Sequence, residues 1–106
     1  MGGISFTVAQ DGLDMAAAFE AARQTAAHHR GWAEDSGTIA TKQHPVLVHD
    51  GPPLPAAAAH ELAQRLLAEF DGVLGDHYSP QAGAIPVAAV DGGPITGWLF
   101  VGWAND

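Results

Sequence analysis

The feature that most constrains the fold is a run near the C-terminus, Ile95 to Trp103, that is apolar on both of its faces as a strand. It holds two of the chain's three tryptophans. Alternation along a strand gives two sets of side chains: Ile95, Leu99, Val101 and Trp103 on one side, and Thr96, Trp98 and Phe100 on the other. A strand that is apolar on both faces is covered on both faces. The run therefore predicts a strand with both faces covered, and the sequence leaves open what covers the second face.

A second apolar run, Gly83 to Val90, precedes it, and the turn-forming block Asp91 to Pro94 separates the two. Two such runs around a short block of Gly, Asp and Pro predict a β-hairpin with a four-residue loop. Gly97 and Gly102, inside the final strand, indicate bulges or close approaches of another chain segment.

Three earlier segments have clear periodicity. Ile4 to Val8 alternates apolar and polar residues, which predicts a half-exposed strand. Met15 to His29 and Ala56 to Phe70 each carry an apolar stripe at helical spacing, and the first stripe is mostly alanine.

The segment from Thr38 to His49 is ambiguous. Thr38 to Gln43 and Val46 to His49 both have the composition of strands, and Pro45 between them marks an edge, a bulge or a turn. The sequence leaves open whether they form two strands or one bent strand. The order of elements predicts one α+β domain over residues 1–106, with a four- or five-stranded, mainly antiparallel sheet and two helices on one face.

Composition and charge limit the classes of partner and site that the chain can have. Twelve Asp and Glu against four Lys and Arg give a net charge of −8, and four scattered cations cannot supply the basic footprint that nucleic acid requires. Cysteine is absent from the sequence, so disulfides and thiolate metal sites are excluded. The N-terminus does not resemble a leader, and apolar runs are too short to span a membrane, so we expect a soluble, cytoplasmic protein.

Six histidines raise the question of a metal site. His60-Glu61 begins like a zinc-protease helix motif, but that motif needs a second histidine at the position held by Gln64. We therefore predict an exposed helix face there, and expect neither a metal site nor another cofactor.

Two imidazoles lie beside carboxylates at the ends of elements, in His49-Asp50 and Asp76-His77-Tyr78. Such pairs fit acid-base chemistry, or equally the capping of loops by carboxylates. No catalytic residue is assigned. The candidate ligand-binding residues are Trp32, His49, Asp50, His77 and Tyr78.

The C-terminal third carries a further pattern: Asp76-His-Tyr-Ser-Pro80, then Ile85-Pro86, then Gly97-Trp-Leu-Phe-Val-Gly-Trp-Ala104. This third resembles small uncharacterised domains of actinobacteria and their phages. The resemblance implies no activity, but a phage context favours a protein that binds and modulates a host factor.

These observations lead to three hypotheses. If two helices cover one face of the sheet, aromatic residues remain on the other, and an exposed patch of that kind marks an interface. The first hypothesis is a protein-interaction module, either a homodimer or a modulator of a host or partner protein, with interface residues Trp98, Phe100 and Trp103. The second is a small enzyme or ligand-binding domain at a sheet end. The third is an acidic mimic that inhibits a nucleic-acid-handling protein.

Overall fold

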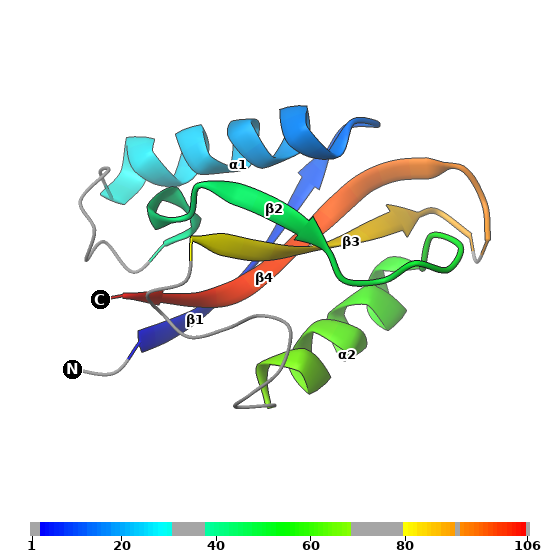
Figure 1. Ribbon diagram of the computed structural model, residues 1–106. Helices are drawn as coiled ribbons and strands as arrows, with labels where there is room; N and C mark the ends of the chain where they lie inside the picture. The colour runs from blue at the N-terminus through cyan, green and yellow to red at the C-terminus, as the bar shows by residue number, and fades with distance from the viewer. Residues whose placement is uncertain (1–2, 31–37, 69–79, 91, 106) are drawn as a thin grey trace.

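The computed structural model describes residues 3–30, 38–68, 80–90 and 92–105 (Figure 1). Its elements in chain order are β1 (Gly3–Asp11), α1 (Met15–Arg30), the short 3-10 helix η1 (Ile39–Thr41), β2 (His44–Leu47), α2 (Ala56–Leu67), β3 (Gln81–Ala88) and β4 (Ile95–Asn105). The strands form one sheet in the order β1-β4-β3-β2. β4 is antiparallel to β1 and β3, whereas β2 is parallel to β3. The predicted α+β class is confirmed, and the sheet has four strands, within the predicted four or five.

The predicted hairpin is β3 and β4, and both faces of β4 are covered, as its two-faced apolarity predicts. In the strand order, β4 lies between β1 and β3. Gly92 has a φ of 73° in the connecting turn, a conformation that glycine adopts without a steric penalty. β1 extends beyond the predicted strand at both ends.

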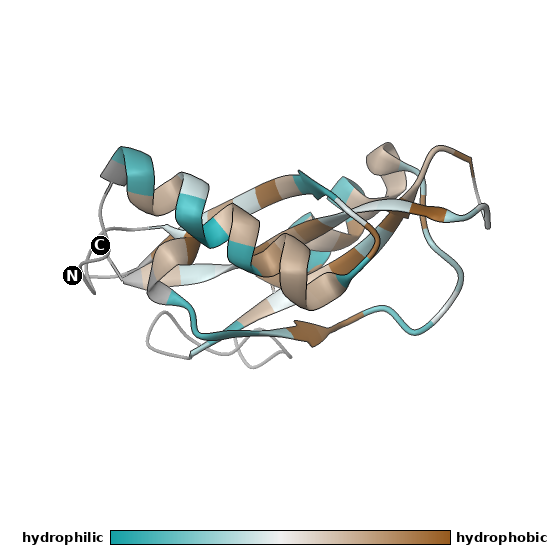
Figure 2. Ribbon diagram, turned by 90° about the horizontal axis from the view of Figure 1, so that it is seen from above, coloured by the Kyte–Doolittle hydropathy of each residue, from teal (hydrophilic) through white to brown (hydrophobic). Residues whose placement is uncertain are grey.

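The two helices lie on opposite faces of the sheet, so their predicted placement on one face is wrong (Figure 1). One cluster packs α1 against Trp98 and Phe100, and its aromatic centre is an edge-to-face contact of Phe19 with Phe100, with ring centroids 5.5 Å apart. The other packs α2 against Leu99 and Val101. Figure 2, which looks down on α1, shows hydrophobic stretches of the strands passing beneath that helix.

Sheet topology explains why the helices separate. β1, β2 and β3 all run parallel to one another, because β1 and β3 are each antiparallel to β4. The chain therefore makes two crossovers, from β1 to β2 through α1 and from β2 back to β3 through α2. Such crossovers are right-handed in nearly all proteins, and two that run in opposite directions across a sheet place their helices on opposite faces.

A β-bulge changes the face of the first residue of β4. Val87 is opposite Gly97, but Ala88 is opposite Ile95, so Thr96 is an extra residue in β4. Ile95 consequently packs against the α1 cluster, with Trp98, and not on the side of Leu99 as simple alternation predicts.

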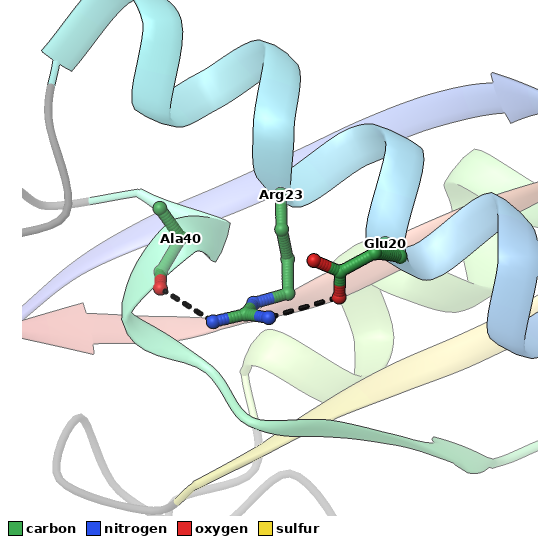
Figure 3. A network of polar contacts seen from close by, with 3 residues as sticks. All are labelled: Glu20, Arg23 and Ala40. Carbon is green, nitrogen blue, oxygen red and sulfur yellow. Dashed lines mark hydrogen bonds and ion pairs between the residues drawn. The ribbon is translucent and has the colours of Figure 1, made fainter.

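The predicted strand at Thr38–Gln43 is also wrong, because Ile39–Thr41 form η1. The Thr38 hydroxyl accepts a hydrogen bond from the Ala40 amide at 3.2 Å, the local capping that competes with strand formation. Arg23 holds η1 against α1: it pairs with Glu20 at 2.9 Å and donates to the Ala40 carbonyl at 3.4 Å (Figure 3). Within the described part of 38–49, the one strand is β2, and Pro45 lies inside it.

The two glycines of β4 mark close approaches, as predicted. A Cβ atom on Gly97 would lie 2.8 Å from the Gln10 carbonyl oxygen, and one on Gly102 would lie 3.0 Å from the Phe6 ring. Both contacts are with β1, whose register against β4 runs without a shift from Gly3 to Asp11. β1 is therefore held tightly to β4 along its full length.

Candidate interaction surface

The predicted aromatic patch is not on the surface. Trp98 is 7% exposed and Phe100 is fully buried, because α1 covers the face on which both lie. Trp103 is half-buried. It is two residues from Val101 in β4, so by alternation it lies on the same face of the sheet, which α2 covers. The premise that two helices leave an aromatic face bare is therefore wrong for Trp98 and Phe100. Trp98 and Phe100 are therefore core residues and cannot form the predicted interface.

The burial of Trp98 encloses the N–H group of its indole ring. Among the described residues, no acceptor bonds the buried indole N–H. Leaving such a donor unsatisfied costs about 1–3 kcal/mol, so packing of the ring against the α1 cluster, and not a polar contact, holds Trp98 in place.

Of the candidate ligand-binding residues, the structure describes only His49 and Asp50. The His49 Nε2 atom lies 2.9 Å from the Pro52 carbonyl oxygen, which places the imidazole in a local turn. Both residues border an open hollow of about 310 Å³ beside Val46 to Val48. The other candidates, Trp32, His77 and Tyr78, lie outside the described residues.

A smaller hollow, which sequence reasoning did not find, lies between the start of α2 and the sheet. Gly97 is among the residues that line it, and its polar lining residues include Asp11, His60 and Thr96. Its volume is about 80 Å³. Pockets for substrates or cofactors are typically about 300–1,000 Å³, so this hollow accepts only a group of a few atoms.

Among the described residues, no group of three or more His, Cys, Asp and Glu is placed to hold a metal ion. None of the helices in the described ranges is long and apolar enough to cross a membrane.

The largest unpartnered feature of the described chain is the outer edge of β1. β1 is at the end of the sheet, and within the described ranges β4 is the strand that pairs with it. The Gly12 amide donates to the Thr96 carbonyl at 3.3 Å. Hydrogen bonds alternate along an antiparallel pair, so the even-numbered residues of β1 bond to β4. The odd-numbered residues direct their N–H and C=O groups away from the sheet: Gly3, Ser5, Thr7, Ala9 and Asp11.

Proteins usually protect such edges with proline, lysine, a bulge or a very short strand. β1 has none of these: it is nine residues long, lacks Pro and Lys, and pairs with β4 without a bulge. Asp11 is its one charged residue, at its C-terminal end.

The side chains beside this edge leave room for another strand. Phe6 and Val8 pack against the α1 cluster, so Ser5, Thr7 and Ala9 lie on the opposite face, where all three are exposed and small. Ile4, on the α1 side, is 47% exposed. The sequence predicted a half-exposed strand here, but strand order, which decides that it is an edge, is not visible in periodicity.

Comparison with known proteins returned no match: no family model, no curated protein and no solved structure is similar to the chain. The resemblance of the C-terminal third to small domains of actinobacteria and their phages therefore stays a prediction.

Proposed function

We propose that this chain is a protein-interaction module that binds its partner by strand addition to the outer edge of β1. The observation that carries the proposal is a nine-residue edge strand whose outward main-chain groups have no partner among the described residues. In strand addition, main-chain hydrogen bonds supply affinity and the alternating side chains supply specificity.

The environment of the edge supports this mode of binding. Ser5, Thr7 and Ala9 are short, so a second strand can approach to hydrogen-bonding distance without displacing side chains. β1 is anchored to β4 over its whole length, so the edge is ordered before a partner arrives. A preformed surface avoids part of the ordering cost that a flexible segment must overcome on binding.

This proposal keeps the predicted class of function but moves the contact surface from the aromatic residues of β4 to the main chain of β1. The partner contributes an extended segment, either from a second copy of this chain or from another protein.

The test compares three baits: the wild-type chain, Thr7→Pro and Thr7→Val. Proline removes the outward N–H of residue 7 while leaving the bonds from its even-numbered neighbours to β4, whereas valine keeps the N–H and the β-branched shape. Each bait is incubated with extract of the source cells, and retained proteins are quantified. Circular dichroism checks that all three fold.

We expect the proteins retained by the wild-type and Thr7→Val baits, including further copies of the chain itself, to be lost from the Thr7→Pro bait. Identical profiles from the three folded baits would overturn strand addition at this edge. If Thr7→Pro does not fold, Thr7→Lys, which blocks the edge by charge, replaces it under the same criterion.

A further inference from the structure

We infer that the strand that pairs with β1 is the β1 of a second copy, antiparallel and in a register centred on Thr7. This inference rests on the proposed function and names its partner. It makes one continuous eight-stranded sheet through a two-fold axis, with each copy contributing the same surface.

The hydrogen-bonding pattern selects this register. The outward positions are 3, 5, 7, 9 and 11, and pairing around position 7 joins 3 with 11, 5 with 9, and 7 with 7. All five positions then take part on both copies, which gives two bonds for each of five pairs. Moving the centre to Phe6 or Val8 leaves four such pairs. The register centred on Thr7 therefore uses every outward group of the strand.

Side-chain pairing agrees with it. On the α1 side, Phe6 of one copy meets Val8 of the other, an aromatic residue opposite a β-branched one. On the opposite side, Thr7 meets Thr7, a pair that sheets favour. Asp11, the one charged residue of β1, meets Gly3, and the two copies of Asp11 are at opposite ends of the paired strands. Like charges are thus kept apart along the seam.

The far edges of the sheet explain why the partner is a second copy. In the paired assembly both outer strands are β2, which has four residues and contains Pro45. Proline and short length are features that prevent further strand pairing. A second copy consequently places a protected strand at each end of the sheet and closes the assembly at two chains.

The absence of cysteine from the sequence makes the register directly measurable. In separate variants, Ser5→Cys, Thr7→Cys and Ala9→Cys place one thiol on the exposed face of β1. Hydrogen-bonded antiparallel partners have Cα atoms about 5.5 Å apart, inside the ~4.4–6.8 Å range of disulfides. Two residues at position 5 would be about 14 Å apart in this register, four residues along the strand, which is too far.

Under mild oxidation, we expect Thr7→Cys alone to form disulfide dimers. Ser5→Cys alone and Ala9→Cys alone remain monomeric on a denaturing gel, while a mixture of these two variants forms the cross-linked heterodimer. Glu61→Cys, exposed on α2, is the matched control for collisional oxidation. Failure of Thr7→Cys to exceed that control would overturn the register.

Sedimentation of the wild-type chain separates this inference from the proposal on which it rests. A monomer at micromolar concentrations and above would overturn the second copy as the partner. Strand addition to β1 is tested separately, by the comparison of the wild-type, Thr7→Pro and Thr7→Val baits, which does not require the chain to associate with itself.

Discussion

The two outer edges of the sheet are built differently. β2 is four residues long and contains proline, whereas β1 is nine residues long and contains none. On its inner side, β1 is held by an antiparallel ladder to β4, and β2 by a parallel ladder to β3. The two edges also differ in the main-chain groups that each presents on its outer side.

The placement of Pro45 shows how β2 is closed. The amides of His44 and Val48 donate to the carbonyls of Pro80 and Ala84, so the even-numbered amides of β2 point inward, toward β3. Pro45 is then at an outward position, where a missing N–H costs the sheet nothing and denies a donor to any incoming strand. On β1 the equivalent outward position is held by Thr7, whose N–H is intact.

Because of this difference, we expect another strand to add to the sheet beside β1 and not beside β2. With one edge blocked by proline and the other unprotected, we expect an assembly that closes at two chains and does not grow into a fibre. Four changes test the contrast, in order of decreasing effect.

The largest effect is expected from moving proline to the inner side of β1. Val8→Pro removes an amide that bonds to β4, leaves a carbonyl of β4 unsatisfied and deletes a side chain of the α1 cluster. We expect it to lower the free energy of unfolding by roughly 3 kcal/mol or more, measured by urea denaturation. Thr7→Pro is the control and should lower it by far less. Equal losses would show that the inner and outer sides of β1 are wrongly assigned.

The second-largest effect is expected from a charge introduced at Thr7, the centre of the proposed contact between the two β1 strands. Thr7→Lys or Thr7→Glu places like charges opposite each other across the two-fold axis, and we expect each variant to associate at least about tenfold more weakly, equivalent to about 1.4 kcal/mol. A mixture of the two should recover the dimer. Stability of the subunit should change by no more than about 0.5 kcal/mol, because position 7 is exposed.

Gln24→Lys, exposed on α1, is the control for added charge. Sedimentation equilibrium of the single variants and of the mixture gives the result. A mixture that associates no better than either variant alone would show that the two copies of residue 7 do not meet.

Removing the proline from the edge formed by β2 should have a smaller effect on the association of the chain. Pro45→Val restores an outward N–H and a good strand former on β2, whose few outward positions limit the affinity that can be gained. We expect species larger than dimers in light scattering at high protein concentration. A strictly dimeric Pro45→Val chain would mean that something other than proline closes this edge.

The smallest effect is expected from salt. Each copy carries a net charge of −8, so the two chains repel at long range although the seam itself is nearly uncharged. Raising ionic strength from about 0.01 M to about 0.15 M shortens the screening length from about 30 Å to about 8 Å. Self-association measured by sedimentation should tighten severalfold. Weakening with salt would instead show that opposite charges meet at the contact, which a seam with Asp11 as its one charged residue on each copy does not provide.

The sequence carries much of this fold but not the arrangement of its layers. The apolar pattern of β4 correctly predicts a strand that is covered on both faces, and the turn-forming block around Gly92 correctly predicts the hairpin. Periodicity shows which side of a helix is apolar, but not which face of the sheet it meets. That choice follows from the parallel pairing of β2 with β3, a long-range contact that no local pattern encodes.

The same limit explains the errors at Thr38–Gln43 and at the interface. The composition of Thr38–Gln43 favours a strand, but the hydroxyl of Thr38 caps a helical turn, a local contact that outweighs strand propensity. Placing Trp98 and Phe100 at the surface requires that one face of the sheet be uncovered, whereas α1 covers the face on which both lie. The sequence of β1 contains the signal for the open edge, in its length and its lack of proline and lysine, but strand order is needed to interpret it.

The most direct test is amide hydrogen exchange, resolved by residue, at two protein concentrations. We expect the outward amides of Ser5, Thr7 and Ala9 to exchange rapidly in dilute solution and to become protected when the chain is concentrated. The amide of Leu47, outward on β2, should exchange rapidly at both concentrations. Rapid exchange of Ser5, Thr7 and Ala9 at every concentration, with or without cell extract, would contradict the claim that the edge of β1 is where this protein binds its partner.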